Sequence, residues 1–317
     1  MNNKPDLAKL FGANSSDTFL GLKSCQNFEA IDASSAFIGA PCVTPYKAVG
    51  PYARNGPDSI RNASSSLNAN IDRYNFDIDG PLFPSGTKKA VDCGNIEWDE
   101  NDFKKNRTLV KNIINKIIKN GVVPILVGGD DSVPIPMIEA FETLGDNYTI
   151  LQIDAHIDWK KIHMDEKFGL SSTMRRASEM NHIKKIIQVG ARGIGSGSPS
   201  DYEDALNWGV QFYSAEKFHL EGNVNIINSI DNNSNVIICV DIDSMDPSIT
   251  PNTIGRSPGG LNYFQVLGLI KSVANKAKIK AIDFVEIMPE VDIDGIGGLT
   301  VSRLIAATMG IIAKNNL

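Results

Sequence analysis

The stretch VVPILVGGDDS, residues 122–132, carries the pattern on which the predicted fold rests. An apolar run ends at two glycines, and two adjacent aspartates, Asp130 and Asp131, follow it directly. A short run that is apolar almost throughout is typical of a β-strand covered on both faces, as in a parallel sheet between layers of helices. We therefore interpret 122–129 as a buried strand with two carboxylates at its end.

Similar apolar runs alternate with longer amphipathic segments through most of the chain. The segments 108–118, 263–277 and 299–314 have apolar residues at helical spacing and are predicted helices. This alternation indicates an α/β fold, with a parallel sheet and helices on both of its faces. The other predicted strands are 36–41, 148–156, 184–192, 210–215, 235–243 and 281–287.

The composition is that of a soluble globular protein, with 42% hydrophobic and 21% charged residues among 317. A formal charge of −6 gives no support to a nucleic-acid partner. No stretch approaches the roughly 20 apolar residues of a membrane span, and the N-terminus lacks a signal-peptide core, so we expect a cytoplasmic protein without a membrane partner. We predict one domain over 1–317, with 1–34 as an N-terminal extension and the Gly- and Pro-rich stretch 42–100 as loops.

Carboxylates also follow two other predicted strands. The apolar run that begins at residue 148 leads into Asp154, His156 and Asp158, and the run that begins at residue 235 leads into Asp241 and Asp243. Ligands of open α/β sheets bind beyond the carboxyl ends of the strands, so we expect these groups to converge there. Strand alternation predicts that Asp154 shares a face with His156, and Asp241 with Asp243.

So many carboxylates in one place would repel each other and take up protons unless a cation compensated them. Oxygen ligands with one imidazole suit divalent Mn, Mg or Fe, and two such ions would lie about 3.5–4 Å apart in a hydrolytic site. We interpret Asp131 as a metal ligand and Asp130 as a residue that caps or orients the turn. A lone aspartate after a strand is more often a helix N-cap, but clusters after several strands are not explained by capping.

Three of these motifs resemble the signature motifs of the ureohydrolase family, which includes arginase and agmatinase. They are GGDDS (128–132), DAHID (154–158) and DIDSMDP (241–247). GPDSIR (56–61) and FVEIMPEVD (284–292) also resemble family segments, as does PGGL (258–261), so the resemblance covers roughly 35–312. It implies a three-layer α/β/α sandwich with a mostly parallel central sheet, and a homo-oligomer, either trimer or hexamer.

The resemblance also implies a centre of two Mn²⁺ ions per subunit, with other divalent ions possible. Asp154 and Asp241 would be shared between the ions. One ion would be completed by His156 and Asp243, and the other by Asp131 and Asp158. The family normally has histidine where this chain has Asp131.

For catalysis, the resemblance places Glu286 against the substrate guanidinium, and we assign Asp158 as the proton carrier to the departing amine. Leu170 stands where agmatinase-like members have a histidine. His163 is close enough in the sequence to supply that substrate contact, although a histidine at such a position is more often an ordinary surface or loop residue. Trp159 could line the pocket mouth or pack against the sheet.

The predicted reaction is hydrolysis of a small guanidino compound to urea and an amine by a metal-bridging hydroxide, agmatinase-like and part of polyamine metabolism. Guanidinobutyrate, another guanidino acid and guanidine itself remain alternative substrates. A two-metal phosphoesterase is a rival, without a phosphate-binding loop to support it. A catalytically silent oligomeric sensor or scaffold is a second rival, suggested by Asp131 and Leu170.

Overall fold

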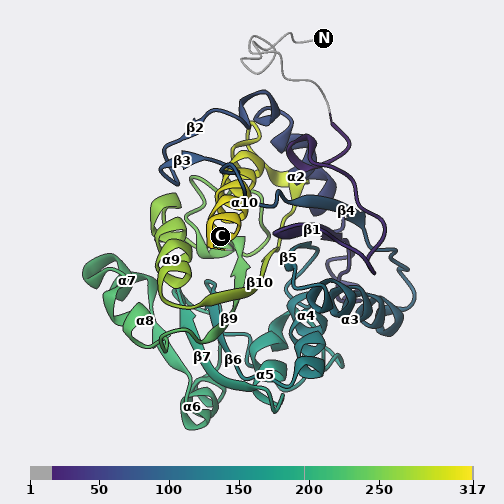
Figure 1. Cartoon of the computed structure of the whole chain (residues 1–317). Helices are drawn as coiled ribbons and strands as arrows, with labels where there is room; N and C mark the ends of the chain where they lie inside the picture. The colour runs from purple at the N-terminus through teal and green to yellow at the C-terminus, as the bar shows by residue number, and fades with distance from the viewer. Residues whose placement is uncertain (1–15, 196, 316–317) are drawn as a thin grey trace.

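The computed structural model describes residues 16–195 and 197–315 and contains an eight-stranded sheet between two layers of helices (Figure 1). All seven pairs of neighbouring strands in this sheet are parallel. The predicted α/β/α sandwich is thereby confirmed. In order across the sheet the strands are β4 (Val91–Asn95), β1 (Ser35–Ala40), β5 (Val123–Gly128), β10 (Lys278–Val285), β9 (Asn235–Asp241), β6 (Tyr148–Ile153), β7 (Ile183–Val189) and β8 (Gln211–Tyr213).

Each face of the sheet is covered by its own hydrophobic core. The alternation along β1 shows the division, because Phe37 belongs to one core while Ala36 and Ile38 belong to the other. Helices α2 (Gly56–Ser64), α7 (Ala215–Glu221), α8 (Val224–Asn228), α9 (Tyr263–Lys276) and α10 (Ile296–Asn315) contribute to the first core. Helices α3 (Phe103–Lys119), α4 (Pro134–Ala140), α5 (Thr173–Ser178) and α6 (Pro199–Trp208) contribute to the second.

The seven predicted strands and three predicted helices are all present, with ends that differ by a few residues. Helix α3 ends where expected, since Asn120 is its C-cap and Gly121 follows with φ +73°. Short 3₁₀ helices connect several elements: η1 (Phe19–Gly21), η2 (Asn68–Asn70), η3 (Phe141–Leu144), η4 (Leu170–Ser172), η5 (Ile242–Ser244) and η6 (Pro289–Val291).

The interpretation of 42–100 as loops was wrong in part. This stretch contains α2, the edge strand β4 and a two-stranded ribbon of β2 (Tyr74–Asn75) and β3 (Gly80–Pro81). β4 escaped detection because its sequence, VDCGN, has an aspartate where an apolar residue is expected in a buried strand. That residue, Asp92, is only 1% exposed and is paired with the buried Arg61 of α2.

The pair between Arg61 and Asp92 provides a test of stability. Arg61 Nε lies 2.9 Å from Asp92 Oδ2, and Arg61 Nη2 lies 3.0 Å from Oδ1. Replacing Arg61 by Met leaves the aspartate buried without its cation, so we expect the free energy of unfolding to fall by about 3–5 kcal/mol. This fall in the free energy of unfolding is measured by denaturant titration, with circular dichroism as the signal. Lys88→Met removes an exposed pair with Asp32 and should leave the unfolding midpoint unchanged.

The described part of the predicted N-terminal extension packs on the edge of the sheet. Phe19 is fully buried, stacks on Phe37 of β1 and donates its N–H to Asp92 Oδ2 at 2.7 Å. Cys25 N–H donates to the Asp92 carbonyl at 2.8 Å and continues this contact along β4. Residues 1–15 of the predicted extension lie outside the described residues.

One helix in the described chain, α10, is long and apolar enough to cross a membrane by length and composition. The expectation that no stretch approaches such a span is therefore corrected. In the structure 83% of its apolar window is buried. It packs against α2 and α9, so its apolar side chains belong to the core of the protein.

Candidate metal centre

The predicted site residues lie at the carboxyl ends of four adjacent strands at the centre of the sheet, β5, β10, β9 and β6 (Figure 1). Asp131 follows β5, Glu286 follows β10, Asp241 ends β9, and Asp154 follows β6. A cavity of about 430 Å³ opens above these ends. The residues that line this cavity include Asp131, His156, Asp158, Asp241, Asp243, Glu286, Tyr46, Val49, Tyr52, Trp159, His163, Ile254 and Leu170.

Two overlapping groups of side chains have the composition of metal sites. In each group one ligand atom from every member lies within 4.8 Å of the others. Asp154 belongs to both groups. The first group is Asp154, His156, Asp241 and Asp243, and the second is Asp131, Asp154 and Asp158.

Turns that follow the strands, and not strand alternation, place these ligands. β6 ends at Ile153, so Asp154 and His156 lie in the turn beyond it, where the His156 N–H donates to Asp154 Oδ1 at 2.6 Å. Asp243 lies in η5, and its N–H donates to Asp241 Oδ1 at 2.8 Å. The prediction of convergence is consistent with these positions, but its argument from a shared strand face was wrong.

Two of the predicted site residues have unusual backbone conformations. Asp158 has φ +44° and Glu286 has φ +66°, values that non-glycine residues rarely adopt. The Glu286 N–H donates to the Gly129 carbonyl at 2.8 Å, and the Asp131 N–H donates to Glu286 Oε1 at 2.8 Å. Such strain is retained only where surrounding contacts hold it, and it concentrates at functional sites.

The charge of the cluster fits a cation. Burial and the neighbouring Asp158 and Asp154 raise the pKa of Asp131 well above its usual range. Burial and neighbouring carboxylates act in the same way on the pKa values of Asp158 and Asp241. Asp131 Oδ2 is buried and has no hydrogen-bond partner among the described residues. A divalent ion would satisfy this oxygen and compensate the negative charge, and the donor set therefore suits such an ion.

His156 adds the only imidazole among the described residues of these groups. Its Nδ1 lies 3.0 Å from Asp243 Oδ2 and 3.5 Å from Asp154 Oδ1. Hydrogen bonds to Asp154 and Asp243 raise the pKa of His156 to about 12. Gly255 makes room for this pair, because a Cβ there would lie 2.5 Å from Asp243 Oδ2.

Asp130 has a different role from its neighbour Asp131, as interpreted from the sequence. It is fully buried, and its carboxylate accepts hydrogen bonds from Thr44 N at 2.6 Å and from Ser132 Oγ at 2.5 Å. It thus ties the turn after β5 to the loop that begins at Cys42. Gly129 permits this approach, since a Cβ there would overlap the Cys42 carbonyl.

Sequence reasoning missed a pair of glutamines beneath the site. Gln152 Nε2 donates to Asp154 Oδ2 and to Asp158 Oδ2, each at 2.6 Å. Gln188 donates to Gln152 Oε1 and, at 2.9 Å, to the Ile157 carbonyl. The sequence did contain a sign of this pair, because each glutamine is a polar residue in an otherwise apolar stretch of a buried strand. Partners of this kind orient metal ligands.

The remaining predicted residues line the cavity or pack around it. His163 lines the cavity, and its ring packs in a T-shaped arrangement against the ring of Tyr46. Leu170 also lines the wall, so an apolar side chain stands where a histidine was expected from the resemblance. Trp159 both borders the cavity and is buried, with Nε1 donating to Asp204 at 2.8 Å.

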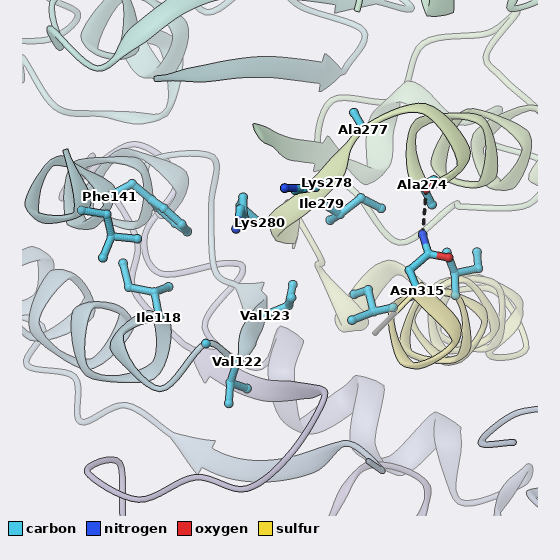
Figure 2. A pocket seen from close by; sticks show the side chains of 14 residues that line it. Ile118, Val122, Val123, Phe141, Ala274, Ala277, Lys278, Ile279, Lys280 and Asn315 are labelled. Atoms are coloured by element: carbon cyan, nitrogen blue, oxygen red, sulfur yellow. Dashed lines mark hydrogen bonds between the residues drawn. The ribbon is translucent and has the colours of Figure 1, made fainter. Parts of the chain in front are cut away.

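A second cavity of about 410 Å³ lies at the opposite, amino-terminal edge of the sheet (Figure 2). It opens where β5 and β10 begin and is bordered by the ends of α3, α9 and α10. Its described lining is mainly apolar, with Lys278 and Lys280 and without a carboxylate. The donor atoms for a divalent ion are therefore at the carboxyl edge.

The parallel sheet with buried, oxygen-rich groups at its carboxyl edge defines an α/β protein with a candidate metal centre. The family model described as "Arginase family" matches residues 33–310. The chain belongs to this family, and it is accordingly a hydrolase of the class that acts on guanidino carbon–nitrogen bonds.

Curated relatives are similar over most of their lengths. The "Uncharacterized 32.2 kDa protein in hmfB 3'region" of Methanothermus fervidus is 32% identical over 241 residues, which are 75% of this chain and 78% of that protein. The mitochondrial agmatinase of Gallus gallus is 27% identical over 282 residues, 87% of this chain and 80% of the relative.

Solved structures have the same fold. Proclavaminate amidino hydrolase from Streptomyces clavuligerus superimposes with a TM-score of 0.81 at 24% identity, covering 96% of this chain and 99% of that one. Formimidoylglutamase from Bacillus subtilis gives a TM-score of 0.81 at 21% identity, covering 95% of each chain. At these identities the likeness concerns the fold alone.

Proposed function

We propose that this chain hydrolyses a guanidino compound to urea and an amine in the manner of an agmatinase, using two Mn²⁺ ions. The observation that carries the proposal is the position of Asp154, which belongs to both candidate ligand groups. A single carboxylate common to two groups is the arrangement that a binuclear centre requires. Relatives named as agmatinases support the choice of substrate class.

In this proposal Asp154 and Asp241 would be shared by the ions, His156 and Asp243 would complete the shell of one, and Asp131 and Asp158 would complete that of the other. The two ions would supply a nucleophilic water at neutral pH, by lowering its pKa from about 15.7 toward about 7. Gln152 would hold Asp154 and Asp158 in place through its two hydrogen bonds.

The chain's own residues would bind the substrate and move its proton. Glu286 would pair with the guanidinium, because its carboxylate lies in the cavity beside the ligand groups. Burial and the nearby Asp130 hold the pKa of Glu286 well above its usual range, which a bound cation would reverse. Asp158 would carry a proton to the departing nitrogen, so that urea and a neutral amine leave.

Agmatine is the first substrate to test, followed by guanidinobutyrate, other guanidino acids and guanidine. The tail of the substrate would lie along the outer wall of the cavity. His163 is our candidate for a substrate contact there, while Leu170 offers an apolar surface. Lys160 in the lining is already paired with Asp201 at 2.6 Å, which makes it a poor partner for a substrate carboxylate.

The test is a product assay with a panel of guanidino and phosphate compounds, with manganese added and then removed by a chelator. Urea from a guanidino substrate, lost on chelation and restored by manganese, is the expected result. Release of inorganic phosphate instead would favour a two-metal phosphoesterase. No product from any compound, with the ions bound, would favour a catalytically silent scaffold.

Metal content gives a separate prediction. Protein saturated with manganese should contain two ions per chain, measured by mass spectrometry of the metal after gel filtration. One ion per chain at saturation would contradict the binuclear centre. With Asp131, five ligand carboxylates face four positive charges, which favours a hard ion over one that prefers nitrogen. Asp131→His should therefore raise the affinity for Zn²⁺ or Ni²⁺ relative to Mn²⁺.

We further propose that the subunits form a trimer or a hexamer, as the resemblance to the family implies. Light scattering of the purified protein during gel filtration measures the assembled mass. A monomeric mass at micromolar concentration would contradict this part of the proposal.

A further inference from the structure

Tyr52 lies in the loop before α2 and lines the cavity. Its hydroxyl oxygen is 2.9 Å from Oε1 and 2.7 Å from Oε2 of Glu286. A hydroxyl has only one hydrogen to donate. An oxygen this close to both acceptors therefore lies in the fork between them.

A guanidinium pairs with a carboxylate most strongly through two parallel N–H···O bonds, one to each oxygen. Those bonds approach through the same fork that the Tyr52 hydroxyl occupies. The Asp131 N–H already donates to Oε1 of Glu286 at 2.8 Å. The carboxylate therefore cannot accept both Tyr52 in the fork and a guanidinium that bonds to both oxygens.

We propose that Tyr52 is a gate on the guanidinium subsite. Its hydroxyl occupies the fork of Glu286 while substrate is absent and leaves when the substrate pairs with both carboxylate oxygens. This inference rests on the proposed function, because it takes Glu286 to be the guanidinium partner. It adds a residue that sets the affinity for guanidinium without touching the reacting carbon.

Contacts just after Tyr52 hold the backbone of its loop in place. Asn55 Nδ2 donates to Glu290 Oε1 at 2.8 Å, and a Cβ on Gly56 would lie 2.9 Å from the Gly128 carbonyl. The loop is therefore held against the ends of β5 and β10 just after Tyr52. Because the hydroxyl oxygen lies on the axis of the ring, freeing the fork requires a change of the Tyr52 rotamer about Cα–Cβ, which moves the side chain and leaves the loop backbone in place.

The carboxylate of Glu286, by contrast, is fixed from several directions. It is 4% exposed, its backbone is held at φ +66°, and the Asp131 N–H holds one oxygen. Burial and the carboxylate of Glu286 raise the pKa of Tyr52 above its usual range, so the phenol stays a neutral donor. The neutral Tyr52 hydroxyl is thus a hydrogen-bond donor that a guanidinium could replace at the Glu286 carboxylate, whose other neighbours include acidic side chains.

The test is direct binding of guanidinium chloride to the manganese-loaded protein, measured by isothermal titration calorimetry. Tyr52→Phe removes the hydroxyl and keeps the ring, so we expect the Kd to fall by about tenfold. In a protein that already carries Glu286→Gln, adding Tyr52→Phe should leave the Kd for guanidinium unchanged. Tyr263→Phe is the matched control, since its hydroxyl donates to Asp77 Oδ2 at 2.7 Å outside the cavity lining, and it should leave the Kd unchanged.

Suppose that guanidinium binding is lost in Glu286→Gln but that Tyr52→Phe binds guanidinium no more tightly than the unmodified protein. This result would overturn the gate and leave the proposed function standing. If the Glu286→Gln protein binds guanidinium as tightly as the unmodified protein does, or if the unmodified protein does not bind it, the assignment of Glu286 and the gate fail together. A tenfold gain that disappears in the Glu286→Gln background supports the gate.

Discussion

Asp154→Ala should remove metal binding and activity together. Asp154 is the residue common to both ligand groups, so its loss affects both proposed ions at once. We expect the metal content of manganese-saturated protein to fall below one ion per chain. We expect kcat/KM for urea release to fall by at least about 10³-fold, because the ions contribute several kcal/mol of transition-state stabilisation. Metal analysis and the urea assay on the same sample check both effects.

Asp231→Ala provides the control for this experiment. It makes the same change in an exposed carboxylate that pairs with Lys185, and it should alter neither measurement. Circular dichroism establishes that the Asp154→Ala protein is folded. Turnover close to that of the unmodified enzyme, in a folded Asp154→Ala protein, would refute the site.

Glu286→Gln should separate activity from metal binding. Glu286 belongs to neither ligand group, so the protein should still bind two ions per chain. The change removes the negative charge proposed to pair with the guanidinium. Loss of one member of a buried ion pair costs about 3–5 kcal/mol, so kcat/KM should fall by roughly 10²- to 10⁴-fold. Steady-state kinetics and metal analysis measure the two properties.

Glu290→Gln is the matched change at a nearby exposed carboxylate, which accepts a hydrogen bond from Asn55. It should reduce kcat/KM far less than Glu286→Gln does. Parallel loss of metal and activity in Glu286→Gln would show that this carboxylate supports the centre and does not select the guanidinium. An equal fall of kcat/KM in Glu286→Gln and Glu290→Gln would indicate that both changes disturb the loop after β10.

The sequence predicts the central strands well because they are buried on both faces. The apolar runs that form β5, β6 and β9 have no other stable environment in a folded chain. β4 was missed because its stability depends on Asp92 and on a partner, Arg61, that is distant in the sequence. A pattern of single residues does not reveal a pair that forms only after α2 has packed.

The candidate site likewise contains some residues that the sequence predicts and others that it does not. Motifs next to strand ends identified Asp131, Asp154 and Asp241, because strand ends in a parallel sheet meet at one edge. The contact of Tyr52 with Glu286 was not predicted, since the two residues are 234 positions apart along the chain. The position of Tyr52 depends on how its loop closes over the sheet, which neither periodicity nor a local motif records.

The hydrogen bonds of Gln152 and Gln188 couple the candidate centre to the alignment of β6 and β7, in which these two residues lie opposite each other. Sliding β7 by one residue would turn Gln188 to the other face of the sheet. Gln152 Oε1 would then lose its donor, and the amide that restrains Asp154 and Asp158 would be free to turn over. The affinity for a metal ion would therefore depend on the register of these two strands. A folding intermediate with β7 out of register would bind the ion weakly.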